Sequence, residues 1–145
     1  MSFTDIAATN AMFEAFFQGN PVRPIVTEMR DGFAAINLMT DAQHIRPGNM
    51  VSGPTQMSLA DTVAYVCIFT KIGIEPMAVT SNLNMHFLRP CIGPNVRAEG
   101  KMVRISQSSA VIDVRIFGEG HDEPSSISTV AYALPKPKTT KTRSK

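Results

Sequence analysis

The chain has 145 residues, of which 43% are hydrophobic, and its formal net charge is +2. A chain of this length suits one domain with a buried core, and no apolar stretch reaches the roughly 20 residues of a membrane-spanning helix. Five basic side chains crowd the C-terminal end, and removing their charges from +2 leaves −3 for the body: Lys136, Lys138, Lys141, Arg143 and Lys145. A mildly acidic body is not a nucleic-acid-binding surface, so we expect neither a nucleic acid nor a membrane as a partner.

Residues 1–134 are expected to form one domain, followed by a basic, disordered tail at residues 135–145. The N-terminus lacks the pattern of a secretory signal, so we expect a cytoplasmic protein. Cys67 and Cys91 stand among apolar residues, and the three histidines are scattered without the spacing of metal ligands. We therefore expect two buried free cysteines, no metal and no cofactor.

The first predicted element is an amphipathic helix over residues 2–18. Ser2 resembles an N-cap residue with Asp5 as its partner at the third helical position, and Gly19-Asn20-Pro21 would end the helix.

Two short apolar strands are predicted next, at residues 25–30 and 33–39. They are joined at Asp31-Gly32, which is a strong hairpin signal. Residues 40–51 are rich in turn formers and are expected to be a loop.

A second, longer helix is predicted over residues 54–71. It is apolar almost all round, which is typical of a helix at the centre of a fold. Gly53 and Pro54 suit its start, with Gly53 as the cap, and Gln56 stands where a capping-box partner would lie. Gly73 closes the helix.

Asp61 is the only charged residue between Pro54 and Thr70. Asp is rarely buried without a partner, so a lone carboxylate in such an apolar helix lowers stability. Chemistry or a specific hydrogen-bond network usually explains such a residue, and Asp61 is therefore the first candidate for a functional group. The alternative is a structural carboxylate that is satisfied by backbone donors at a subunit interface.

Alternating apolar and polar residues predict four further strands, at residues 79–87, 96–102, 110–116 and 126–134. Turn-like breaks separate the last three, which should therefore run as antiparallel neighbours. A twisted antiparallel sheet whose apolar face wraps the central helix is the simplest way to bury these elements, and it gives an α+β fold.

The order helix, hairpin, loop, buried helix and four-strand meander resembles the hotdog fold, in which a curved antiparallel sheet encloses one long helix. Ser52-Gly53-Pro54 followed by Ser58-Leu59-Ala60-Asp61-Thr62 resembles the motif of one family of hotdog acyl-CoA thioesterases, the phenylacetic-acid-degradation (PaaI-like) type. That motif reads His-Gly-Gly, six residues, and then Asp or Glu in a Leu-Ala-Asp-Thr context. The later Phe87-Leu88-Arg89-Pro90 adds to the resemblance.

The resemblance implies that Asp61 is the catalytic carboxylate, as a general base or a nucleophile, and that the backbone N–H of Gly53 polarises the thioester carbonyl. The implied activity is hydrolysis of a fatty or aromatic acyl-CoA.

The chain departs from the family pattern around this motif. Ser52 replaces the usual His, Pro54 replaces the second Gly, and Arg46 replaces an Asn that helps to position water. Thr80 aligns with a Ser that some members use for the same purpose. Ser52, Thr80 and Arg46 are therefore candidate accessory residues. An ordinary helix cap is the alternative for Ser52, and a structural role is the alternative for Thr80.

Helix geometry predicts a site shared between two subunits. Pro54 and Asp61 lie about 10 Å apart along one helix axis, so one helix cannot present both Gly53 and Asp61 to one carbonyl carbon. A shared site requires two antiparallel helices, and thus a homodimer or a dimer of dimers. The strand at residues 80–87 is the candidate for pairing across the two-fold axis.

Substrate contacts are less determined by the sequence. Tyr65, one turn after Asp61, and Met57 are candidates for the acyl pocket. The candidate cations for the CoA phosphates are Arg89, Arg97, Lys101 and Arg104. The acyl-chain preference and the choice between CoA and acyl carrier protein stay open.

Two other functions also stay open. A non-catalytic acyl-CoA-binding hotdog protein would fit the absence of the usual His and Asn. A hotdog dehydratase generally pairs a catalytic His with an acidic residue, and no His lies between Met50 and Asn84, so it is the weaker alternative.

Overall fold

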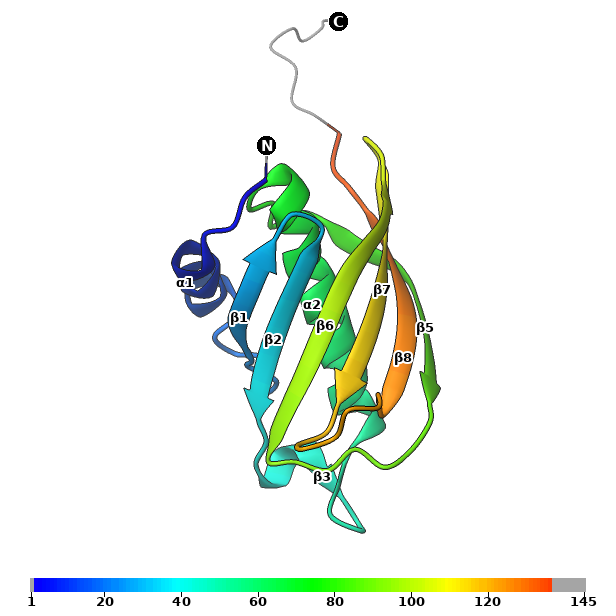
Figure 1. Ribbon diagram of the computed structural model, residues 1–145. Coiled ribbons are helices and arrows are strands. Elements are labelled where there is room, and N and C mark those ends of the chain that lie inside the picture. The colour runs from blue at the N-terminus through cyan, green and yellow to red at the C-terminus, as the bar shows by residue number, and fades with distance from the viewer. Residues whose placement is uncertain (1, 137–145) are drawn as a thin grey trace, which may run out of the picture.

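The computed structural model describes residues 2–136, which form a six-stranded antiparallel sheet with a long helix against one face (Figure 1). The elements in chain order are α1 (Ile6–Phe16), β1 (Ile25–Arg30), β2 (Phe33–Met39), the 3₁₀ turn η1 (Ala42–His44), β3 (Ile45–Arg46), β4 (Met50–Val51), α2 (Gly53–Ile72), β5 (Val79–Phe87), β6 (Asn95–Ile105), β7 (Ser109–Phe117) and β8 (Ser126–Ala133). The predicted α+β arrangement of an antiparallel sheet around one central helix is confirmed. The expected tail lies, beyond Lys136, outside the described residues.

The strand order in the sheet is β1-β2-β6-β7-β8-β5, with every neighbouring pair antiparallel. The last three strands are neighbours as predicted, but the expected four-strand meander is wrong for β5. This strand pairs with β8, because β2 already occupies the free side of β6. In Figure 1 the connection from β5 to β6 runs along the lower end of the sheet, and β5 is left as an edge strand.

The start of α2 is set by a side-chain cap. Ser52 has extended backbone angles, and its Oγ accepts a hydrogen bond of 3.2 Å from the backbone N–H of Thr55. Gly53 is therefore the first helical residue, and the prediction of Gly53 as the cap is wrong, because a serine hydroxyl satisfies a donor that glycine cannot. Gln56 is not a capping-box partner, since its Nε2 donates to the carbonyl of Val51.

The core lies between α2 and the inner face of the sheet. The helix ends at Gly73, which has a φ of +84°, close to the predicted boundary. Most of its residues after Leu59 are fully buried, including Val63 and Phe69. At Gly100 on β6 a Cβ would lie 3.3 Å from the backbone carbonyl oxygen of Val63, so glycine allows the close approach of helix and sheet. Both cysteines are buried and free, as predicted.

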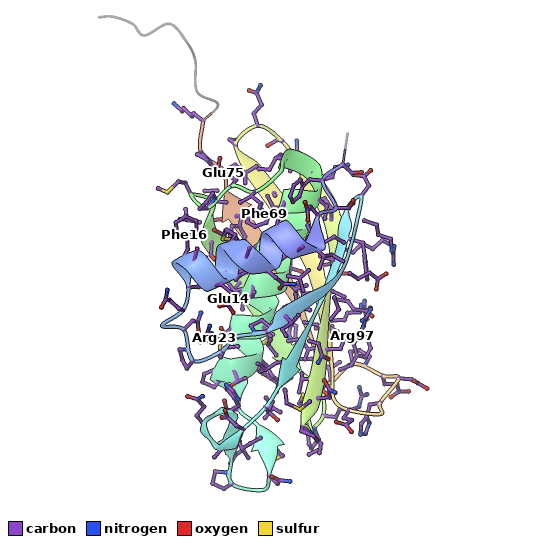
Figure 2. All side chains as sticks on the ribbon, turned by 90° about the vertical axis from the view of Figure 1, so that its left-hand side faces the viewer. Glu14, Phe16, Arg23, Phe69, Glu75 and Arg97 are labelled. Atoms are coloured by element: carbon purple, nitrogen blue, oxygen red, sulfur yellow. The ribbon has the colours of Figure 1, made fainter. Side chains whose placement is uncertain are left out.

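Helix α1 is shorter than predicted. Its cap is Asp5, whose Oδ1 accepts a 2.9 Å hydrogen bond from the N–H of Ala8, so the prediction of Ser2 as the cap is wrong. The residues before it are not helical because Phe3 donates its backbone N–H to the carbonyl of Thr70 on α2. Figure 2 shows α1 lying across α2 on the side of α2 away from β6 and β7.

No helix among residues 2–136 is both long and apolar enough to cross a membrane. Within the same residues, no cluster of three or more His, Cys, Asp or Glu side chains is placed to hold a metal ion.

Candidate active site

Asp61 lies on α2 at a hollow of about 310 Å³ between α1, α2, β5 and β8. Its side chain is half-buried, whereas most of the helix around it is buried, as expected for a central helix. The reason is the position of β5 at the sheet edge, which leaves this part of α2 open. The hollow brings Asp61 together with the predicted residues Tyr65 and Thr80, and with Phe13, Phe17 and Tyr132.

Two side-chain hydroxyls hold one oxygen of the Asp61 carboxylate. Oδ1 accepts a short hydrogen bond from Thr80 Oγ1 and a second one, of 2.9 Å, from the hydroxyl of Tyr132. The same hydroxyl lies 2.9 Å from the backbone carbonyl oxygen of Asp61. Oδ2 has no hydrogen-bond donor among the described residues. The carboxylate is therefore anchored through one oxygen, by side chains rather than by the backbone donors of the structural alternative, and its second oxygen is free.

Both tyrosines at this hollow stay protonated at neutral pH. Burial raises the pKa of Tyr132 far above its ordinary value, and the negative charge of Asp61 raises this pKa further. Burial is also the main cause that raises the pKa of Tyr65 to about 12, with Glu75 and Asp61 contributing. Tyr65 donates its hydroxyl to the carbonyl of Pro76, at 2.9 Å, and not to Asp61. Tyr132 is therefore the neutral donor that faces the carboxylate.

Aromatic rings form the apolar wall of the hollow. The ring centroids of Phe13 and Phe17 each lie 5.9 Å from that of Tyr65, in edge-on arrangements. The ring of Tyr132 stacks on that of Tyr65 with a centroid distance of 5.9 Å, and the buried ring of Phe69 lies 4.6 Å from that of Tyr65. Such contacts fix the rings and give an apolar surface beside a carboxylate.

The start of α2 lines a second hollow, of about 330 Å³, together with Arg46, Phe87, Leu88 and Arg89. Gly53 lies here, about 12 Å along the helix from Asp61. Its backbone N–H has no acceptor among the described residues, as expected for the first turn of a helix. The structure thus brings Gly53, Arg46 and Arg89 together and separates them from Asp61.

The remaining predicted residues lie elsewhere. Ser52 is the cap of α2, and its Oγ is bonded within the first turn. Met57 is exposed and lines neither hollow. The other three candidate cations, Arg97, Lys101 and Arg104, lie on β6.

Arg97 is already paired with two carboxylates. It contacts Glu99 at 2.7 Å and Glu28 at 3.1 Å, and it lies on the side of the sheet away from α1 (Figure 2). Its charge is therefore compensated within the protein, whereas Arg46 forms no ion pair with any described residue.

The sequence did not predict that Tyr132 contacts Asp61, nor that Phe13 and Phe17, at α1, line the same hollow. Tyr132 stands 71 residues after Asp61, and only the pairing of β5 with β8 brings it to Thr80, its cross-strand partner. The available signal was that Tyr132 is one of only two tyrosines and occupies an inward position of an alternating strand. Phe13 and Phe17 were visible as the apolar face of a helix, but not as the wall of a hollow.

Comparisons with known proteins agree with this architecture. A protein from Thermoplasma volcanium, to which an esterase activity is provisionally ascribed, is 29% identical over 106 residues, covering 73% of this chain and 78% of that protein. A crystal structure assigned as a thioesterase, from a Silicibacter species, is 27% identical, covers 93% of this chain and 94% of its own, and has a TM-score of 0.83.

Two more distant structures show the same fold. The Escherichia coli PaaI protein of the phenylacetic acid degradation operon is 20% identical, with 88% and 90% of the two chains covered and a TM-score of 0.75. A Bacillus halodurans protein crystallised with CoA is 21% identical, with 92% and 93% covered and a TM-score of 0.68. The hotdog fold predicted from the sequence is thereby confirmed. Because the family model described as Thioesterase superfamily matches residues 48–125, more than half of the sequence, this chain belongs to that superfamily.

Proposed function

We propose that this protein hydrolyses the thioester bond of a fatty or aromatic acyl-CoA, at a site that two copies of the chain build together. The observation that carries the proposal is the position of the two hollows at the two ends of β5. Thr80, which is bonded to Asp61, lies near the first end of the strand. Phe87, whose ring would be 3.6 Å from a Cβ on Gly53, is its last residue.

The edge position of β5 supports a two-fold arrangement. Its outer edge has no partner among the described strands, and edge strands pair readily with a second chain. Antiparallel pairing of two copies about the midpoint, Leu83, would set Asn82 opposite Asn84 of the partner subunit and would bring the Thr80 end of each strand to the Phe87 end of the other. The Asp61 hollow of each copy would then lie next to the helix start of the other, which gives two identical sites.

Gly53 would stabilise the negative charge that develops on the thioester oxygen. Its N–H is free, and it lies at the positive end of the α2 dipole. One preorganised donor of this kind supplies about 3 to 4 kcal/mol of transition-state stabilisation.

Asp61 would act through Oδ2 while Tyr132 and Thr80 hold Oδ1. As a general base, it takes a proton from the water whose oxygen attacks the carbonyl carbon, and the C–S bond then breaks with the proton going to sulfur. As a nucleophile, it attacks the carbonyl carbon itself, releases the thiol and leaves an anhydride that water hydrolyses. Both routes end in a carboxylic acid and free CoA, and both need an ionised, fixed carboxylate.

Arg46 and Arg89 would contact the phosphates of CoA, since both flank the hollow at Gly53. Arg46 is the stronger candidate, because Arg89 is partly compensated by Glu123 at 3.2 Å. The Bacillus halodurans neighbour that was crystallised with CoA adds support for this class of ligand.

The position of the histidines does not favour a dehydratase. His44 is buried, accepts from the N–H of Asp41 and lies 2.8 Å from the carbonyl oxygen of Pro21, so both ring nitrogens are engaged. His86 is exposed and alternates with Met85, which packs against the core, so it lies on the face of β5 opposite to the one that carries Thr80 and faces Asp61. Within residues 2–136, no His lines the Asp61 hollow.

Thiol release from a panel of short, medium, long and aromatic acyl-CoAs tests the proposal. Asp61→Asn keeps the shape of the side chain but loses the basic oxygen, so we expect kcat to fall about 10²- to 10⁴-fold. Glu75→Gln is the matched control, because it removes a neighbouring carboxylate that does not line the hollow. Equal rates for wild type and Asp61→Asn would refute the catalytic role. A stable complex with intact acyl-CoA and no thiol release by the wild type would indicate a binding protein instead.

A further inference from the structure

A third and larger hollow continues from the Asp61 hollow along α1. It has a volume of about 600 Å³ and lies between α1, α2 and the segment that leads into β1. The two hollows share four lining residues, namely Phe13, Phe17, Asn20 and Thr62. We call the larger one the α1 groove. Because the shared residues include Thr62, the neighbour of Asp61 on α2, the groove opens directly beside the carboxylate.

The far end of the α1 groove is fixed by α1 and the start of β1. Asn10 accepts a 2.9 Å hydrogen bond from the backbone N–H of Val26 and donates to its carbonyl at 3.2 Å. These bonds hold Ala11 on α1 close to Ile25 on β1, and both line the groove. A ligand that enters the groove from the Asp61 hollow would pass Phe13 and Phe17, which line both hollows, before it reached Ala11 and Ile25, which line the groove alone.

The polar side chains of the α1 groove have partners within the protein, while Glu14 and Arg23 remain largely exposed to solvent, with 78% and 50% of their side chains accessible. The partners are Val26 for Asn10, Arg23 for Glu14 (3.7 Å), the N–H of Val22 for Asn20 (2.9 Å) and the carbonyl of Ser58 for Thr62 (2.8 Å). Glu14 and Arg23 lie on the same side of the molecule in Figure 2. The charged pair is exposed to solvent, whereas the rest of the lining is mainly apolar, and this apolar part suits a hydrocarbon chain better than a charged ligand.

We infer that the α1 groove binds the distal part of an unbranched medium or long acyl chain, which extends from the Asp61 hollow past Phe13 and Phe17. This inference rests on the proposed thioesterase function and adds the class of acyl group. It also gives α1, which lies outside residues 48–125, a role in substrate choice.

The chain-length dependence of kcat/KM tests the inference. Burial of one methylene favours binding about fourfold, so several methylenes in the groove should make dodecanoyl-CoA a better substrate than butanoyl-CoA by at least about tenfold. Ala11→Trp fills the far end and should lower kcat/KM for dodecanoyl-CoA at least tenfold, with butanoyl-CoA changed less than twofold. Ala15→Trp is the control, since Ala15 is exposed on the same helix and does not line the groove.

Ile25→Asp provides a second variant that does not depend on packing. Ile25 is 62% exposed, so a charge there is compatible with folding but is unfavourable beside a hydrocarbon chain. It should show the same selective loss for dodecanoyl-CoA. Equal kcat/KM for short and long chains, or equal losses for Ala11→Trp and Ala15→Trp, would overturn the inference.

Failure of the proposed function can be told apart from failure of this inference. If the wild type cleaves no thioester, the proposed function fails, and calorimetric binding of dodecanoate then tests the groove alone. Binding by the wild type and Ala15→Trp but not by Ala11→Trp supports the groove as a hydrocarbon site. Absence of binding, or equal binding by all three proteins, overturns it.

Discussion

The oxyanion role of Gly53 can be tested by a substitution that removes one N–H and leaves the helix intact. Gly53 is the first residue of α2, where the ring of proline is compatible with the helix and no intrahelical hydrogen bond is lost. Ser52, with a φ of −68° and a ψ of 155°, already has the extended conformation that a following proline favours. Pro54 follows directly and restricts the residue before it, so the melting temperature of Gly53→Pro checks that the helix start is kept. The variant is expected to fold and to lose the proposed donor.

Gly53→Ala is the matched control, because it adds a side chain but keeps the N–H. A Cβ at this position would lie 3.6 and 3.8 Å from two ring atoms of Phe87, which is ordinary van der Waals contact. The added volume therefore requires no rearrangement, and kcat of this variant should stay within about threefold of the wild type.

Removal of one oxyanion donor costs about 10²- to 10³-fold in kcat, or about 3 to 4 kcal/mol. The assay is thiol release at saturating acyl-CoA, with the melting temperature and the sedimentation behaviour measured for each variant. A folded Gly53→Pro protein that associates like the wild type and keeps the kcat of Gly53→Ala would refute the reasoning, since it would have lost the N–H without losing activity.

Two further predictions concern Asp61 and its surroundings. Tyr132→Phe removes a hydroxyl that is bonded to the carboxylate, and a hydrogen bond to a charged group contributes about 1.5 to 3 kcal/mol, so kcat should fall about tenfold or more with KM little changed. Tyr65→Phe loses a bond to a backbone carbonyl instead and should keep a kcat about tenfold above that of Tyr132→Phe; equal values would contradict a positioning role for Tyr132. Co-expression of Asp61→Asn with Gly53→Pro should restore about a quarter of the wild-type activity, because half of the dimers are mixed and each mixed dimer has one intact site. No recovery above either variant alone would contradict a site shared between subunits.

Local signals were sufficient to predict most of the elements. Asp31-Gly32 joins two strands, and Gly73 ends α2, because these residues suit backbone conformations that others avoid. The apolar character of residues 54–71 predicted a central helix to within one residue at each end. The caps were harder, since Ser2 and Asp5 are both good cap residues and only the bond from Phe3 to α2 selects between them.

Nonlocal pairing is what the sequence could not reveal. The position of β5 beyond β8 depends on which strand occupies the free side of β6, and alternation within one strand carries no information about its neighbours. The partners of Asp61 follow from that pairing, since Thr80 and Tyr132 face each other across β5 and β8. A lone acidic residue could be recognised from composition, but its environment could not.

The division of the site between the two ends of β5 accounts for the unusual state of Asp61 in a single chain. A catalytic carboxylate needs firm anchoring and a free oxygen, and here Tyr132 and Thr80 supply the anchoring while Oδ2 has no donor. In one chain, Gly53, the proposed oxyanion donor, lies at the other hollow. Pairing of two β5 strands would supply that donor and would also cover the open edge beside Asp61. Under the proposed function, the same contact would then stabilise the sheet edge and complete the site, so catalysis would require the associated form.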